Sequence, residues 1–325
     1  MLFITPDPAT VARLRTKLVA AIRESIKPGT PYALIDWPGY ANVGDSALWL
    51  GALSLLREVT GESPVYIAPT TNIDPKEATL PDDCVIFING GGNFGSLWQS
   101  YQHNRIRLLK RFPNHRIIQL PQSIAFDDKR LLDQTATAIA THGHFTLMTR
   151  DHGSHDFAKR AFDCEVMLCP DTAFGLGALS SNHSPNSECF LLMRRDKERH
   201  ADTPSAQALL SIGFSYDWTK YRKPPAREQF FTWLVHQRHW RHPYLVKRAA
   251  VACERQAEYR LDRGLSMLGR GERVITDRLH GHILSLLLGK PHYVFDNSYG
   301  KTFGYINTWY PELAQPVRWQ SLTPR

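Results

Sequence analysis

The sequence predicts an α/β protein with two doubly wound domains and a cleft between them. Short β-rich runs alternate with helical stretches along the first half of this 325-residue chain, and the alternation resumes after residue 188. Such alternation indicates βαβ units and parallel sheets. A Ser-, Asn- and Pro-rich stretch at 178–188 is typical of a linker. We therefore expect domains at 1–180 and 185–325, with ligands at the carboxyl ends of the strands, and leave open whether the last helix packs back on the first domain.

The first domain is expected to contain strands at 32–37, 65–68, 84–90, 116–123, 145–150 and 166–171. Between the first two, apolar residues recur at helical spacing from Leu48 to Val59, and Asp45 is well placed as the N-cap of that helix. Further helices are expected through 105–112 and near 128–141 and 152–161. The second domain is expected to contain strands at 189–194, 273–277 and 292–296, and helices near 226–268 and 281–289.

The composition suits a globular protein that binds an anion. The net charge is +8, which fits an anionic small molecule, a membrane surface or nucleic acid, but no nucleic-acid-binding module is recognisable. No apolar run approaches the ~20 residues of a membrane span, and the N-terminus lacks the layout of a secretory signal. The five cysteines form no C-x-x-C pair, which favours reduced thiols and argues against zinc. We therefore expect a cytoplasmic protein that holds no metal.

Two loops at expected strand ends favour contact with a ligand. The first, "NVGDSAL", places Asn42, Gly44 and Asp45 at a strand-to-helix turn, where a helix N-terminus offers N–H groups to an anion or a hydroxyl. Asp45 could equally serve only as a helix cap. The second, "INGGGNFG", includes Gly91, Gly92 and Asn93, and consecutive glycines allow close approach of a substrate to the backbone. It matches neither G-x-G-x-x-G nor the P-loop, so dinucleotide or ATP binding finds little support.

Cationic side chains follow strands in both domains. Arg150 stands at the end of the strand at 145–150 and Arg278 follows the one at 273–277, so a cleft would bring them together, and Lys301 adds a third cation. Guanidinium groups bind carboxylates and phosphates bidentately. His280 could shuttle a proton near neutral pH. Asp171 also follows a strand and is a candidate for the cleft. The plainer alternatives are a surface pair of Arg150 with its neighbour Asp151, and a histidine satisfied beside a helix cap.

Taken together, these stretches resemble the polysaccharide pyruvyl transferase family. The resemblance rests on "NVGD", "INGGG", "QLPQSI", "TRD", "CPD" and "TDRLHGHILSLLLGKP" followed by "DNSYGKT", in this order from about residue 36 to residue 304. It implies two Rossmann-like domains in a GT-B-like arrangement. It also implies phosphoenolpyruvate as donor and a sugar of a surface glycan or exopolysaccharide repeat unit as acceptor. The residues that the resemblance assigns to phosphoenolpyruvate are Arg150, Arg278, Leu279, His280 and, as an additional cation, Lys301.

The implied chemistry agrees with the residues. Phosphoenolpyruvate carries a carboxylate and a phosphate, which two arginines and a lysine complement. Ketal formation requires an acid that protonates C3, for which His280 qualifies, and a base for the attacking hydroxyl, for which Asp45 is the candidate. The remaining candidates for the acceptor or the cleft loops are Asn42, Gly44, Gly91, Gly92, Asn93 and Asp171. Fixed cations stabilise the leaving phosphate without a metal, so phosphoenolpyruvate is expected as co-substrate and no cofactor.

The segment 218–248 interleaves basic and aromatic residues. This pattern suits either an anionic membrane surface, with an acceptor carried as a lipid-linked oligosaccharide, or a solvated basic helix packed on the second domain. Nucleic acid fits less well, since the other basic residues are scattered. Between 196 and 270 the chain departs from the family pattern, which leaves the acceptor open. The competing hypotheses are a GT-B glycosyltransferase that uses a nucleotide sugar and a non-catalytic glycan-binding subunit.

Overall fold

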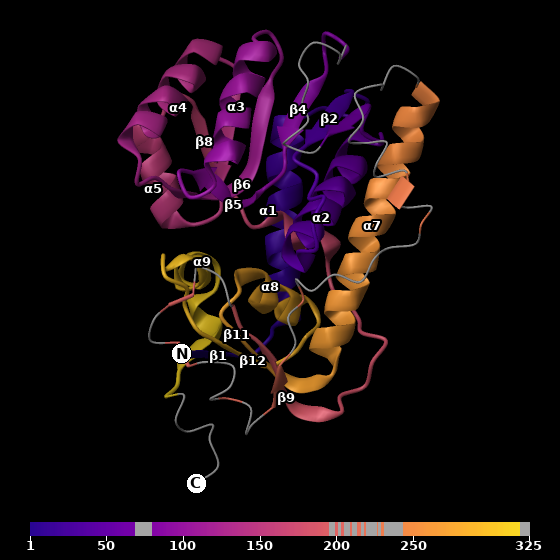
Figure 1. Cartoon of the computed structure of the whole chain (residues 1–325), viewed down its shortest axis with the longest axis vertical. Helices are drawn as coiled ribbons and strands as arrows, with labels where there is room; N and C mark the ends of the chain where they lie inside the picture. Colours follow the sequence, from indigo (N-terminus) through magenta and orange to yellow (C-terminus); the bar gives the residue numbers. More distant parts are fainter. Residues whose placement is uncertain are drawn as a thin grey trace.

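Strands and helices form two sheets with helical layers between and around them (Figure 1). The computed structural model describes residues 1–68, 80–194 and 243–318, together with 199–200, 203–204, 209, 213–215, 218, 226 and 229–230. The mixed α/β class with parallel sheets is confirmed. The two-domain GT-B arrangement stays a prediction.

The first sheet is parallel and has the strand order β3-β2-β4-β6-β7-β8, with β5 paired to β6. Its strands are β2 (Tyr32–Ile35), β3 (Tyr66–Ala68), β4 (Val85–Ile88), β5 (Gly91–Gly95), β6 (Ile117–Ala125), β7 (Phe145–Thr149) and β8 (Glu165–Leu168). The sequence of β4, VIFI, is apolar at every position and fully buried. A strand of this kind belongs to a sheet that is covered on both faces.

Helices cover both faces of this sheet. Ile86 and Ile88 face a cluster that includes side chains of α3 (Gln99–Arg111), α4 (Lys129–His142) and α5 (His152–Ala161). Phe87, between them on the strand, faces the opposite cluster with α1 (Pro8–Ser25) and α2 (Val43–Thr60). The alternation follows from the two-residue period of a strand.

The second sheet has the strand order β10-β9-β11-β12-β1-β13. Its strands among the described residues are β1 (Leu2–Ile4), β9 (Ser187–Leu192), β10 (Phe214–Ser215), β11 (Gly271–Thr276), β12 (His292–Val294) and β13 (Ala314–Pro316). The pairs among β9 to β12 are parallel, whereas β1 lies antiparallel between β12 and β13. The sequence prediction placed all of residues 1–180 in the first domain, whereas β1 belongs to the second sheet. A three-residue strand carries no local signal that reveals a partner near the other end of the chain.

Among the described residues, three further helices belong to the second part of the chain. They are α7 (Pro243–Gly269), α8 (Leu279–Leu287) and α9 (Lys301–Trp309), with short 3-10 turns at Thr172–Leu176 and Pro311–Leu313. In Figure 1, α7 (orange) runs down the right-hand side past both sheets. It is joined to the first part by an ion pair of Arg57 with Glu254 and by Arg260, which donates to the carbonyl of Pro38 at 2.6 Å. The last helix, α9, contacts α5, where the backbone N–H of His152 donates to Thr308 Oγ1.

One apolar core joins the two sheets. The same cluster of buried side chains contains Phe87 of the first sheet and Phe190 and Val274 of the second, with α1, α2 and α8 between them. The basic aromatic segment 218–248 lies mostly outside the described residues, so its membrane role stays a prediction. Within the part of the chain that is described, no helix has the length and apolar character needed to cross a membrane.

Candidate active site

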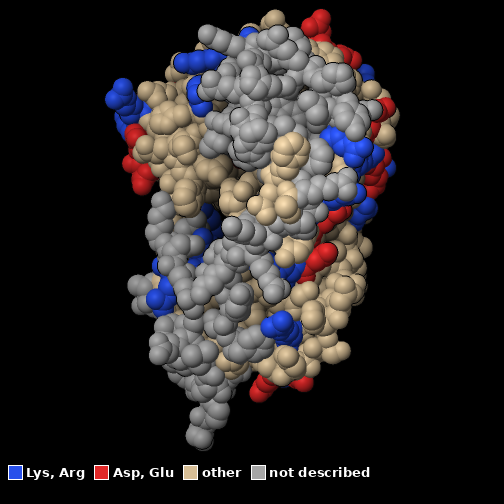
Figure 2. Space-filling model, turned by 45° about the vertical axis from the view of Figure 1, so that its right-hand side comes forward, with Lys and Arg blue, Asp and Glu red and all other residues tan. Residues whose placement is uncertain are grey.

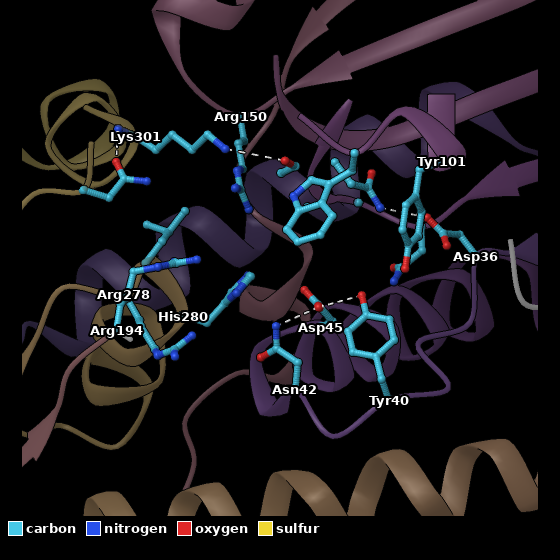
Figure 3. A pocket seen from close by; sticks show the side chains of 18 of the residues that line it. Asp36, Tyr40, Asn42, Asp45, Tyr101, Arg150, Arg194, Arg278, His280 and Lys301 are labelled. Carbon is cyan, nitrogen blue, oxygen red and sulfur yellow. Dashed lines mark hydrogen bonds between the residues drawn. The ribbon is translucent and has the colours of Figure 1, made fainter. Parts of the chain in front are cut away.

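A cavity of about 510 Å³ opens where loops of both sheets meet (Figure 3). Loops after β2, β4, β7, β9 and β11 contribute to its wall, as expected for ligands at the carboxyl ends of parallel strands. Figure 2 shows the molecule from the side, with Lys and Arg atoms inside a hollow between its upper and lower parts. The residues from the sequence prediction that line the cavity are Asn42, Asp45, Gly91, Gly92, Asn93, Arg150, Arg278, Leu279, His280 and Lys301.

Four Lys and Arg side chains of the described residues line this cavity. Arg150 comes from the first sheet, Arg278 precedes α8, and Lys301 begins α9. The fourth, Arg194, was missed by the sequence analysis. Its position after a strand was a usable signal. Leu192 of β9 pairs with Thr276 of β11, and these strands are parallel neighbours. Arg194 and Arg278 each lie two residues beyond this pair, so they reach the same edge of the sheet.

Arg150 is held firmly at the cavity wall. Its Nε donates to Ser123 Oγ at 2.9 Å and its Nη1 to Asp171 Oδ2 at 2.7 Å, while Trp309 Nε1 donates to its carbonyl oxygen at 2.8 Å. The surface pair with Asp151 does not form, because Asp151 instead caps α5 by accepting from the Ser154 backbone N–H at 2.7 Å. A buried, multiply bonded guanidinium is preorganised for an anion.

Asp171 acts from behind the wall. It is fully buried and is not among the residues that line the cavity, although the sequence made it a candidate for the acceptor or the cleft loops. Its Oδ2 contacts Arg150 and lies 3.5 Å from His280 Nε2, and its Oδ1 accepts from the Ala173 backbone N–H. Burial by itself raises the pKa of this carboxyl, but His280 and Arg150 outweigh burial and lower the pKa to about 2. Asp171 therefore stays ionised and orients both cavity-lining residues.

Gly44 is also absent from the wall and supports His280 instead. A Cβ at position 44 would lie 2.3 Å from His280 Nδ1 and 2.6 Å from His280 Cβ. Only glycine lets the imidazole lie this close to the first turn of α2. Gly44 was predicted to let a ligand approach the backbone, but the side chain of His280 occupies that space.

Asp45 is not the N-cap of α2. Asn42 takes that place, and its Oδ1 accepts from the Gly44 backbone N–H at 3.0 Å. The Asp45 carboxylate faces the cavity, where its Oδ2 accepts from Tyr40 Oη and from Asn42 Nδ2, both at 2.8 Å. The N-cap interpretation failed because both residue types cap helices and the first turn begins at Val43. Asp45 is thus available for chemistry in the cavity.

The glycine-rich stretch forms β5 rather than a loop. Gly91 has a φ of 138°, which favours glycine, and Gly92 brings the backbone close to two cations. A Cβ at Gly92 would lie 3.3 Å from Arg150 Nη2 and 3.4 Å from Lys301 Nζ, and Lys301 Nζ donates to the Gly92 carbonyl at 3.5 Å. Asn93 lines the cavity beside them. The three residues assigned here from sequence therefore lie at the cavity.

The far end of the cavity holds residues that the sequence analysis did not single out. Asp36, Tyr40 and Tyr101 lie there in Figure 3, and Trp98 also lines the cavity. Asp36 directly follows β2. This was a usable signal, since a polar residue after an apolar strand marked the other site residues. Among the described residues no three His, Cys, Asp or Glu side chains gather as metal ligands, and a reaction without a metal stays a prediction.

The comparisons agree with the motifs. Residues 42–299 match the model of the family described as polysaccharide pyruvyl transferase. The chain is 33% identical over 282 residues to "Putative pyruvyl transferase EpsO" of Bacillus subtilis, covering 84% of each chain. It is 31% identical over 289 residues to "Pyruvyl transferase 1" of Schizosaccharomyces pombe, covering 85% of this chain and 69% of the other.

A solved structure shares the fold. The crystal structure of an uncharacterized protein from Klebsiella pneumoniae aligns with a TM-score of 0.59 at 17% identity, covering 91% of this chain and 93% of that one. At this identity the likeness concerns the fold alone. From the family match and the two pyruvyl transferase relatives, the chain belongs to the polysaccharide pyruvyl transferase family and is a pyruvyltransferase enzyme.

Proposed function

We propose that the donor is phosphoenolpyruvate and that the product is a pyruvate ketal across two hydroxyls of a sugar in a surface or exopolysaccharide repeat unit. The observation that carries this proposal is the presence of Arg150, Arg194, Arg278 and Lys301 around one cavity that also holds His280. A carboxylate and a phosphate on one small molecule need several cations, and guanidinium groups bind both bidentately.

The proposed reaction begins with a proton transfer. His280 donates a proton to C3 of the enol, which becomes a methyl group and leaves C2 electrophilic. One sugar hydroxyl adds to C2 and gives its proton to Asp45. The bond between C2 and the phosphate oxygen then breaks, and the cations stabilise the phosphate as it leaves. A second hydroxyl adds to C2 and closes the ketal, and the proton that it loses balances the one that the released phosphate takes up.

Asp171 supports the first step. Because it contacts both His280 and Arg150, one buried carboxylate sets the position of the proton donor relative to an anion-binding group. Leu279, next to His280 on the wall, adds apolar surface beside the methylene group of the donor.

Thermal stabilisation by phosphoenolpyruvate tests this proposal. A ligand that binds only the folded state at a hundredfold excess over its Kd stabilises by about 2.7 kcal/mol, so Tm should rise by several degrees. Arg278→Ala and Arg194→Ala should lose most of this rise, and Arg130→Ala, on the exposed face of α4, should keep it. No rise with phosphoenolpyruvate, together with a rise caused by a nucleotide sugar, would instead favour a glycosyltransferase.

The role of metal ions has a separate test. Fixed cations provide the charge that a metal would otherwise supply, so phosphate release from phosphoenolpyruvate should persist in EDTA. Loss of activity in EDTA and its return with magnesium would contradict this.

A further inference from the structure

The cavity is divided by charge. Arg194, Arg278 and Lys301 lie on one side in Figure 3, and Asp36 lies at the opposite end with Asp45 between. An anionic donor belongs among the cations, so the acidic end is open to the acceptor. This assignment rests on the proposed function and concerns a part of the site to which no role has been given.

Asp36 has an unusual backbone conformation. Its φ is 73°, and it is the only non-glycine residue with positive φ in the part of the chain that the structure describes. It directly follows β2, and its side chain lines the cavity although the residue is only 6% exposed. Aspartate enters the left-handed region more readily than most residues, yet backbone strain in a folded protein concentrates at functional sites. The left-handed turn places a carboxylate at the end of a central strand.

This carboxylate is fixed by a network. Asn93 Nδ2 donates to Asp36 Oδ2 at 3.2 Å, and Asn93 Oδ1 accepts in turn from Gln122 Nε2 at 3.0 Å. Arg105 Nη1 donates to the Asn93 carbonyl at 3.0 Å, and its charge acts on Asp36. Burial raises the pKa of Asp36, and the charge of Asp45 raises it further, whereas Arg105 and Asn93 lower it. The net result is a pKa of about 6. Near neutral pH the group is ionised and close to its pKa, as a general base should be.

Ketal formation needs two proton acceptors. Two hydroxyl O–H bonds break while two O–C2 bonds form, so both hydroxyls must lose a proton. Overall, one proton is taken up at C3 and the other by the released phosphate. Asp45 serves one hydroxyl, but its Oδ2 already accepts from Tyr40 and Asn42. A second carboxylate on the same wall would let each hydroxyl meet its own base.

We propose that Asp36 is the second general base of the reaction and that it holds one hydroxyl of the acceptor. As the oxygen of this hydroxyl bonds to C2 and closes the ketal, its proton passes to the Asp36 carboxylate and from there, through solvent, to the released phosphate. Trp98 and Tyr40, which are 41% and 43% exposed and line the cavity, give the pyranose ring aromatic surfaces to pack on. Tyr101 lies beside Asp36 and closes this end of the subsite.

Asp36→Asn tests the base. Asparagine keeps the shape and tolerates positive φ but takes up no proton, so kcat should fall about 100-fold or more. The assay follows phosphate release from phosphoenolpyruvate with p-nitrophenyl hexopyranosides as acceptors. The rise of Tm caused by phosphoenolpyruvate should be unchanged. Asp133→Asn, exposed on α4, is the matched control and should behave as wild type.

The pH dependence separates a base from a structural residue. In wild type, kcat/KM for the glycoside should rise with pH up to about 6 and then level off, and this limb should vanish in Asp36→Asn. The groups that face Asp36 and also act on its charge are Arg105, Asp45, Tyr40 and Tyr101. Because the folded-state pKa is raised, ionisation of Asp36 costs stability as pH rises from about 4 to about 6. The variant should therefore have an equal or higher Tm at pH 7.5 while it loses turnover.

Glycoside binding tests the subsite without turnover. Saturation-transfer NMR should show methyl hexopyranosides bound to wild type and to Tyr259→Ala, an exposed aromatic position on α7, but not to Trp98→Ala. Unchanged kcat in Asp36→Asn, equal binding by Trp98→Ala, or no glycoside binding or turnover by wild type would each overturn the inference. Loss of the phosphoenolpyruvate effect in wild type, with glycoside binding intact, would instead overturn the proposed donor alone.

Discussion

At the scale of single residues, His280 can occupy its place only because residue 44 has no side chain. The imidazole lies over the first turn of α2 with its Nε2 toward Asp171, and the space beneath its ring is the space of a missing Cβ. Close packing of this kind leaves no room for a methyl group. An added methyl group would therefore displace the neighbouring side chains.

Gly44→Ala should therefore lower kcat at least tenfold by displacing His280. Alanine would otherwise stabilise a helix interior by about 0.5–1 kcal/mol relative to glycine, so a loss of activity reports the clash. Gly304→Ala in α9 is the matched control, since no atom lies within 4 Å of its added Cβ. Phosphate release and Tm are measured for both, and a Gly44→Ala enzyme with normal kcat would contradict the supporting role of Gly44.

At the scale of elements, α8 is attached to its neighbours by a buried chain of rings. His292 Nδ1 donates to the Lys290 carbonyl at 2.8 Å, so its Nε2 accepts from His282 Nδ1 at 2.6 Å, and Tyr310 Oη donates to His282 Nε2 at 2.8 Å. Burial lowers the pKa of His292 to about 4 and that of His282 well below its usual range, which keeps both neutral. The second histidine of "RLHGH" thus joins α8, β12 and the end of α9 without contacting the cavity.

Tyr310→Phe should cost about 1–3 kcal/mol, because it leaves the buried acceptor on His282 without a donor. Urea unfolding at pH 7.5 measures the loss, and Tyr299→Phe, at a residue that is 49% exposed, is the control. The lowered histidine pKa values also predict that wild-type stability falls as pH drops from about 6.5 toward 4. Equal stability of the two variants would show that the ring chain does not bear on α8.

At the scale of the whole molecule, one core holds the two sheets together. Apolar side chains of both sheets belong to one buried cluster, and α7 joins the parts by ion pairing and hydrogen bonding. Two parts of a protein that share one apolar core are expected to unfold in a single transition, whereas parts with separate cores can unfold in separate transitions.

Calorimetry should accordingly show one cooperative unfolding transition. Ile4→Ala, in β1, should lower Tm of that single transition, since Ile4 is fully buried in the shared cluster and such truncations cost about 2–5 kcal/mol. Two resolved transitions in wild type, with Ile4→Ala affecting one of them, would mean that the sheets unfold independently.

The candidate site shows where local reasoning succeeds. Arg150, Arg278 and His280 each follow a strand, and the carboxyl ends of parallel strands meet at one edge, so position along the chain predicted their meeting. Arg194 obeys the same rule and was overlooked. Asp45 was expected as a cap because two capping residue types stand three positions apart, and only the start of the first turn distinguishes them.

By itself, the sequence determined the α/β class, the order of most strands and helices, and the strand-end residues that line the cavity. These depend on periodicity and on turn chemistry, which neighbouring residues encode. Only the tertiary structure decided that β1 joins the far sheet, that Asp171 and Gly44 act on His280 from behind, and that Asp36 lies opposite the cations. Each of these features depends on contacts between segments that are distant in the sequence. The steric fit and the strand pairing at such a contact depend on both segments, so the local pattern of one segment does not reveal the other.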